Sequence, residues 1–219
     1  MKIMALDTST EACSAALMVE DQVYSRFEVA PRKHAELILP MIDDLLATTN
    51  TKLTDLDGIA FGRGPGAFTG VRIATGIAQG LAYSSNLPVI PISSLATLAQ
   101  AYKDKAKYVA AAFDARMGEV YFGLYQTGDV VSLVEDEQVC KPEDLQFTID
   151  GEFFGVGTGW ATYGEILKNK LKNKLSDYHG DCYPDAKFML PIAESELKNG
   201  NAIQPEQAAP VYLRDKVTG

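Results

Sequence analysis

Residues 3–7 read IMALD, a continuous apolar run that ends at a carboxylate, and residues 108–114 repeat this pattern as YVAAAFD. A short apolar run of this kind is typical of a strand buried on both faces of a sheet. After each run come a turn, further strands and helices. The sequence of an apolar strand, an aspartate, a turn and more elements therefore occurs twice, and it predicts a duplicated fold with two related halves.

Hydrophobic periodicity predicts the other elements. Two short polar turns separate the first three strands, which suggests a meander. Helical spacing is strongest over 34–48, although Pro40 lies inside it and should weaken or kink the helix. The charged stretch 101–107 is the best boundary, so we expect a first domain at 1–102 and a smaller one at 103–219. The expected strands are 3–6, 12–19, 22–29, 56–61, 88–92, 108–113, 119–125, 130–134 and 153–156, and the expected helices are 34–48, 71–84, 93–101, 163–175 and 188–197.

Composition limits the class of protein. The 219 residues are 47% apolar and 22% charged, as in an ordinary soluble globular protein, and the formal net charge is −9. An acidic chain lacks the basic surface that holds nucleic acid. If the protein acts on a nucleic acid, we expect it to do so through a partner protein. Three widely spaced cysteines and the lack of a long apolar run predict a cytoplasmic protein in a reducing compartment, with no membrane contact.

The stretch 62–70, GRGPGAFTG, is the most unusual in composition, with four glycines and a proline in nine residues. It must form a tight loop between a strand and a helix. Free backbone N–H groups at a helix start hold anions, which makes the loop a candidate anion site. It is not a Walker loop, because no Gly-Lys-Ser/Thr closes it. The alternative is a strand-to-helix turn that packs closely, and the sequence leaves both interpretations open.

Two carboxylates end the two apolar runs. In a duplicated fold whose halves face each other, Asp7 and Asp114 could hold Mg²⁺ and phosphates between them. The alternative is that each caps a turn. A second glycine turn, at 157–159, resembles a nucleotide-contacting turn. The candidate nucleotide or anion contacts are Asp7, Thr8, Gly64, Gly66, Asp114, Gly157 and Gly159.

Two helices carry apolar or small residues beyond what a lone surface helix needs. Residues 34–48 are rich in large apolar side chains, whereas 71–84 has rows of glycine and alanine that let another backbone approach. The pair could form a subunit contact, or both helices could simply cover the sheet. Zinc-hydrolase and serine-hydrolase motifs are absent from the sequence, and Cys13 is expected to be an inert core residue.

Four blocks carry a family likeness: residues 1–10, 62–73, 114–121 and 210–214. In this order they resemble the TsaB (YeaZ) family, bacterial proteins needed to make threonylcarbamoyladenosine next to the anticodon of tRNA. The likeness covers essentially the whole chain. It implies an α/β fold of the actin/sugar-kinase-like (ASKHA) type, with two lobes that are each a mixed sheet flanked by helices.

The resemblance also implies a role. The related enzyme TsaD holds a metal through an HxxxH motif, and the comparable positions here are Ser94 and Leu98, which do not replace imidazole as ligands. A non-catalytic scaffold is therefore implied, with no metal or catalytic residue, no required cofactor, and a nucleotide only at an interface of the complex. The implied partners are a TsaD-like paralogue, a TsaE-like ATPase and a second copy of the chain, with tRNA contacted only indirectly.

The family pairs through the helices of its first lobe. The residues expected at that interface are His34, Leu37, Ile38, Met41, Leu45, Ile73, Ala74, Ile77, Ala78 and Leu81. Two other functions stay open: a stand-alone nucleotide phosphohydrolase or kinase that uses Asp7 and Asp114, and, more weakly, a peptidase of the former glycoprotease class.

Overall fold

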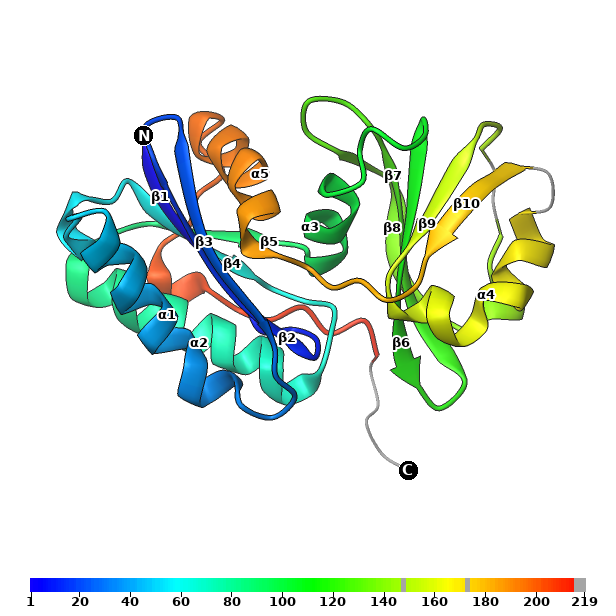
Figure 1. Cartoon of the computed structure of the whole chain (residues 1–219), viewed down its shortest axis with the longest axis horizontal. Helices are drawn as coiled ribbons and strands as arrows, with labels where there is room; N and C mark the ends of the chain where they lie inside the picture. The colour runs from blue at the N-terminus through cyan, green and yellow to red at the C-terminus, as the bar shows by residue number, and fades with distance from the viewer. Residues whose placement is uncertain (147–148, 172–173, 215–219) are drawn as a thin grey trace. The chain divides into compact units, whose positions relative to one another are not determined.

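The computed structural model describes residues 1–146, 149–171 and 174–214 and divides the chain into two compact units (Figure 1). The first unit comprises Met1–Thr97 and Pro184–Val211, and the second comprises Leu98–Tyr183 with the described residues from Tyr212 onward. This division differs from the predicted one, which assigned all of 103–219 to the second lobe. The reason is a late helix that packs on the first sheet.

The first unit is built on a five-stranded mixed sheet with the order β3-β2-β1-β4-β5. The expected meander is confirmed, because β1, β2 and β3 pair antiparallel, while β4 and β5 extend the sheet parallel to β1. The strands are β1 (Lys2–Asp7), β2 (Ala12–Val19), β3 (Gln22–Val29), β4 (Gly58–Gly62) and β5 (Val89–Ile92), and the short η1 (Leu53–Asp55) precedes β4.

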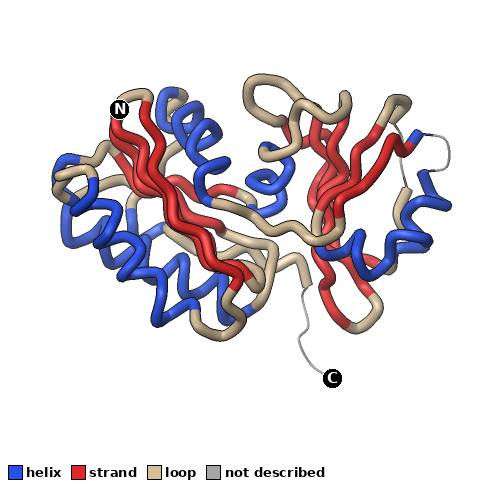
Figure 2. Tube along the Cα trace, viewed as in Figure 1, coloured by secondary structure: helices blue, strands red, loops and turns tan. Residues whose placement is uncertain are grey.

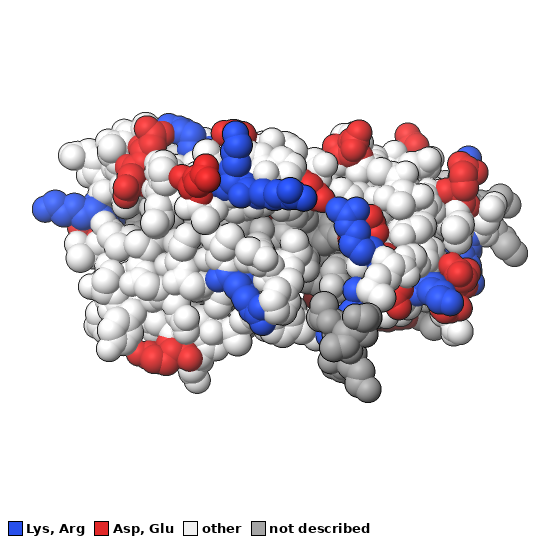
Figure 3. All heavy atoms as spheres, turned by 90° about the horizontal axis from the view of Figure 1, so that it is seen from below, with Lys and Arg blue, Asp and Glu red and all other residues white. Residues whose placement is uncertain are grey.

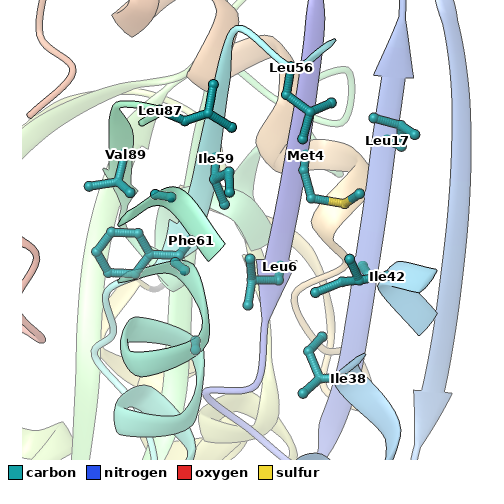
Figure 4. Close-up of a cluster of buried hydrophobic side chains, with 14 of the residues drawn as sticks. Met4, Leu6, Leu17, Ile38, Ile42, Leu56, Ile59, Phe61, Leu87 and Val89 are labelled. Carbon is teal, nitrogen blue, oxygen red and sulfur yellow. The ribbon is translucent and has the colours of Figure 1, made fainter. Parts of the chain in front are cut away.

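Helices cover both faces of this sheet. The pair α1 (His34–Thr48) and α2 (Phe68–Ser85) packs on one face, and α5 (Ala186–Lys198) packs on the other. Figure 4 shows the apolar cluster under the first pair, in which Ile38 and Ile42 of α1 lie near Leu6 of the sheet and Phe61 lies on the other side of Leu6. Because β1 and β4 are covered on both faces, their side chains are almost entirely buried, as their unbroken apolar sequence predicts.

The second unit repeats the same sheet order (Figure 2). Its strands run β10-β9-β6-β7-β8, so β6 pairs antiparallel with β7 and parallel with β9, as β1 does with β2 and β4. The predicted duplication is confirmed at the level of topology. The elements are β6 (Tyr108–Arg116), β7 (Glu119–Gln126), β8 (Ser132–Cys140), β9 (Phe153–Val156), β10 (Leu175–His179), α4 (Thr158–Leu171) and the short η2 (Pro142–Asp144). The helix α3 (Ser94–Gln100) contains the point at which the chain passes from the first unit to the second.

The helix predicted over 34–48 is confirmed as α1 with the same limits, and Pro40 lies inside it on its exposed side. The helix expected at 163–175 begins earlier, at Thr158, and the backbone at Tyr163 leaves helical geometry. Within the described residues, no helix has the length and apolar character needed to cross a membrane.

Candidate functional site

Asp7 lies at the end of β1 and is buried, with 1% of its surface exposed. Its Oδ1 accepts hydrogen bonds from the backbone N–H of Ser9 at 2.8 Å and from Ser9 Oγ at 2.6 Å, and its Oδ2 accepts one from Ser94 Oγ at 2.8 Å. Burial raises the pKa of Asp7, while these hydrogen bonds and the nearby His34 act in the opposite direction. The carboxylate is therefore satisfied by its own unit.

The glycine loop at 62–70 brings the β1–β2 turn against the start of α2. A Cβ on Gly66 would overlap the carbonyl oxygen of Ser9, and one on Gly70 would overlap that of Thr8. Thr8 Oγ1 donates to the Gly70 carbonyl at 2.7 Å, and the N–H of Ala67 donates to the Ser9 carbonyl at 2.7 Å. The structure thus brings the candidate contacts of the first unit together, but as a closely packed turn whose polar groups serve one another.

The second set of candidate contacts lies in the second unit. Asp114 accepts from the backbone N–H of Arg116 at 2.8 Å and pairs with its guanidinium at 3.0 Å. Gly157 has a φ of 105° and donates its N–H to Cys182 Sγ at 3.2 Å. Gly157 and Gly159 pack on Ala112, so a side chain at either position would collide with it. These groups too have partners inside the chain.

Ser94 and Leu98, the two positions expected to correspond to the metal ligands of TsaD, are both fully buried. The Ser94 hydroxyl donates to Asp7, and the Leu98 side chain lies beside the Gly157 turn, within 2.9 Å of where a Cβ on that glycine would be. A hydrocarbon side chain has no donor for a metal. Across the part of the chain that the structure describes, no group of three His, Cys, Asp or Glu side chains is arranged to hold one.

Half of the residues expected at a partner interface are core residues instead. The side chains of Ile38, Leu45, Ala74 and Ala78 are fully buried against the sheet, and His34 is 9% exposed. A helix of the expected periodicity buries one stripe on its own sheet, so these residues cannot also face a partner. The expectation that they form the interface is wrong for these five. His34 Nε2 is buried without a hydrogen-bond partner in the structure.

The other five lie at the edge of the exposed surface: Leu37, Met41, Ile73, Ile77 and Leu81 are partly buried. Gly76 and Gly80 alternate with Ile73, Ile77 and Leu81 along α2 and are exposed. A Cβ on either glycine would meet nothing within 4 Å. We call these seven residues the α1–α2 face. In Figure 3, which views the molecule from the side where α1 and α2 lie, the middle of the first unit's surface carries few charged side chains, and most of the charged groups lie along its upper edge.

Three large apolar side chains of α1 and α2 are exposed beyond those expected: Leu39 at 44%, Phe68 at 49% and Tyr83 at 71%. The Arg72 guanidinium stacks over the Phe68 ring at 3.3 Å from its centroid. The available signal was the helical wheel of 68–85, on which Phe68, Arg72 and Tyr83 share a side with the two glycines. A surface of large apolar side chains around two bare glycines is suited to the close approach of another helix.

Comparison with known proteins gives consistent results. The sequence model of the family TsaD, tRNA N6-adenosine threonylcarbamoyltransferase, matches residues 20–218. The tRNA threonylcarbamoyladenosine biosynthesis protein TsaB of Escherichia coli (strain K12) is 46% identical, over 99% of this chain and 96% of its own. The TsaB of Haemophilus influenzae is 43% identical, over 100% of this chain and 95% of its own.

A tRNA N6-adenosine threonylcarbamoyltransferase of Treponema pallidum is 29% identical over 84% of this chain, which corresponds to 47% of that enzyme. Among solved structures, YeaZ from Pseudomonas aeruginosa superposes with a TM-score of 0.91 at 46% identity, covering 97% of this chain and 99% of that one. Together with the two mixed sheets, this match confirms the expected α/β fold of the actin/sugar-kinase-like type.

Proposed function

The chain belongs to the family of the tRNA N6-adenosine threonylcarbamoyltransferase TsaD, in its TsaB-type branch, and from that premise we propose that it is a non-catalytic subunit of the transferase system. It acts in tRNA threonylcarbamoyladenosine biosynthesis. In this proposal it pairs with a TsaD-type enzyme and, with a TsaE-type ATPase, supports threonylcarbamoyl transfer to the adenosine next to the anticodon. The observation that carries the proposal is the 46% identity with a TsaB over nearly the full length of both chains.

The chemistry of the inherited site supports a non-catalytic role. Ser94 and Leu98 supply no imidazole, Asp7 is occupied by Ser9 and Ser94, and the Gly157 N–H is occupied by Cys182. A stand-alone phosphohydrolase or kinase would need these groups free for a phosphate or a cation. In this proposal the chain itself requires no cofactor.

A peptidase has less support still. Burial raises the pKa of the Cys13 thiol to about 12, helped by the nearby Asp7 and Glu28 charges. The pKa of the Cys182 thiol is also raised by burial. A thiol acts as a nucleophile only as the thiolate, so neither cysteine is poised for attack.

The α1–α2 face supports pairing. Glycine costs about 1 kcal/mol relative to alanine inside a helix, and Gly76 and Gly80 pack on nothing in this chain that would offset that cost. A partner helix lying across them would do so, flanked by Ile73, Ile77 and Leu81. The same face serves the second copy in the homodimer form of this proposal.

The acidic charge supports an indirect role toward tRNA. With a net charge of −9, the chain supplies little of the phosphate neutralisation on which RNA affinity depends. In this proposal the other subunits hold the tRNA. The proposed location is the cytoplasm, and the three cysteines are free thiols, in keeping with a reducing compartment.

The test is a mixing experiment with the TsaD-type and TsaE-type proteins of the same organism. Light scattering should show a stable complex with the TsaD-type protein, and tRNA modification in the reconstituted reaction should fall when this chain is omitted. No complex together with unchanged modification would contradict the proposal.

A single substitution locates the contact. We expect Gly80→Arg to abolish complex formation while leaving the melting temperature unchanged or higher, because arginine favours helix and meets open space in the free chain. The matched control is Glu165→Arg on the exposed side of α4, which should leave the complex intact. A Gly80→Arg chain that still binds would place the contact elsewhere.

A further inference from the structure

The outer strand of the first sheet, β3, is regular, and within the described residues no other strand pairs with its outer edge. Its eight residues pair with β2 without a register shift, and it contains neither proline nor lysine. Native proteins usually blunt such edges with bulges, charges or cover, because an open edge is a template for another strand.

The three other described edges are protected in this way, and β10 is one of them, with a register shift against β9 between Leu175 and Asp177. At the far side of the same sheet, β5 contains Pro91 and exchanges two backbone hydrogen bonds with Ile203 at Val89. In the second sheet, the edge strand β8 has two register shifts against β7 and carries three consecutive acidic residues at 135–137. Because the other edges are protected, the open edge of β3 calls for an explanation.

Every second residue of β3 directs its backbone N–H and C=O groups away from β2, where another strand could pair with them. The N–H of Ala30 donates to the Glu11 carbonyl at 3.0 Å, which shows that even-numbered positions turn toward β2. Odd-numbered positions, from Val23 to Val29, therefore direct N–H and C=O groups outward. The Ser25 carbonyl already accepts from Arg26 Nη1 at 2.9 Å, which leaves its second lone pair for another donor.

The same odd-numbered residues expose an apolar row. Val23 is 50% exposed, Phe27 44% and Val29 49%. They lie on the face opposite Tyr24 and Arg26, since Tyr24 packs on the cluster under α1 and Arg26 pairs with Asp44 of that helix. An open backbone edge and three apolar side chains thus coincide on one strand.

We propose that this edge pairs with the β3 edge of a second copy of the chain, antiparallel and with the two-fold axis at Ser25. In this register Val23 lies opposite Phe27 of the second copy, and Tyr24 lies opposite its Arg26, and these two pairs next to the axis are favourable. Moving the axis to Arg26 would place two arginines opposite each other, which cross-strand pairing disfavours.

The charges at the two ends of β3 select a second copy in this orientation. The turn before the strand carries Glu20 and Asp21, and the segment after it carries Arg32 and Lys33, all exposed. Antiparallel pairing brings the acidic end of one copy beside the basic end of the other, and the two-fold axis makes the match twice. A parallel pair would place like charges together.

The inference goes beyond the proposed function and does not rest on it. The β3 edge shares no residue with the α1–α2 face, so the two contacts are separable by mutation.

A cysteine placed on the axis tests the register. Paired residues that exchange hydrogen bonds have Cα atoms about 5.5 Å apart, within the range that a disulfide spans. We expect Ser25→Cys to form a covalent dimer in a glutathione buffer, whereas Val29→Cys, on the same strand and face but away from the axis, should not. Equal cross-linking of both variants, or none by Ser25→Cys, would overturn the proposed pairing.

Sedimentation equilibrium tests the contact without cross-linking, at about 0.15 M salt to screen the net charge. The wild-type chain should self-associate reversibly, and Phe27→Lys should raise the dimer dissociation constant by about tenfold or more, since each copy loses an apolar pair and gains a charge. Because the α1–α2 face is itself a proposed self-contact, both measurements are repeated in the Gly80→Arg chain, where the β3 dimer should remain and Phe27→Lys should weaken it.

The opposite pattern is equally informative. A Gly80→Arg chain that stays monomeric at every concentration, or one whose dimer Phe27→Lys spares, overturns the β3 proposal. Neither result touches the mixing experiment with the TsaD-type protein, so the two proposals fail separately.

Discussion

At the scale of single residues, Asp7 shows how the fold accommodates a buried carboxylate. Burial raises its pKa above the ordinary value of 3.8, and the bonds from Ser9 and Ser94 offset this only in part. The folded chain therefore binds this proton more tightly than the unfolded chain does. The stability that Asp7 contributes is present below about pH 4 and is lost as the pH rises through the folded pKa.

The raised pKa of Asp7 predicts how the stability of an isosteric variant changes with pH relative to the wild type. Asp7→Asn cannot ionise, so we expect its unfolding free energy to rise relative to the wild type as the pH goes from about 4 to 7. Urea unfolding of both chains at each pH measures the difference. A difference that stays constant, or that favours the wild type at the higher pH, would show that the buried carboxylate is not penalised.

The sequence predicts this residue only in part. It shows that Asp7 ends a buried strand, but not that the carboxylate is satisfied, because one of its donors, Ser94, lies 87 residues further along the chain. Cys182, which occupies the Gly157 N–H, is likewise 25 residues away. A motif shows which residue types are available, whereas their partners depend on tertiary structure.

At the scale of elements, substituting alanine for glycine should have opposite effects on stability in the 62–70 loop and in the exposed part of α2. A methyl group on Gly70 would overlap the Thr8 backbone, so we expect Gly70→Ala to cost at least about 2 kcal/mol. Gly76→Ala meets open space and should gain about 0.5–1 kcal/mol through helix propensity. Thermal and urea unfolding of the two variants compare them directly, and equal effects would contradict the packing described for the loop.

The helices and strands were predictable where periodicity is strong. The limits of α1 and the three strands before it agree with their apolar patterns, whereas β10 was missed, since its sequence LSDYH is short, polar and at an edge. Periodicity also finds an apolar stripe without saying what covers it. That is why Ile38 and Ala78 were assigned to a partner when the sheet of their own unit covers them.

At the scale of the whole molecule, the duplication could be predicted and the division of the chain could not. Two apolar strands that each end in aspartate are visible in the sequence, and the two sheets share one strand order. Which sheet a late helix covers is decided by long-range packing. In the structure α5 covers β1 and β2, and Ser14 Oγ accepts the N–H of Ala186 at its start.

This arrangement predicts that damage to α5 acts on the first unit. Leu190 is fully buried in α5, so Leu190→Asp places an unpaired charge in the core of that unit at a cost of several kcal/mol. The single tryptophan, Trp160, lies in the second unit, buried and bonded through Nε1 to the Ala110 carbonyl at 2.8 Å. Its fluorescence therefore reports the second unit alone.

We expect Leu190→Asp to lower the midpoint of the far-ultraviolet circular dichroism transition, to which the helices of the first unit contribute, while the Trp160 fluorescence transition stays close to its wild-type midpoint. The matched substitution is Leu167→Asp in α4, also fully buried, which should shift the fluorescence transition instead. If Leu190→Asp moves both transitions together, the two units unfold as one cooperative body. If it moves neither, α5 does not stabilise the sheet on which it packs.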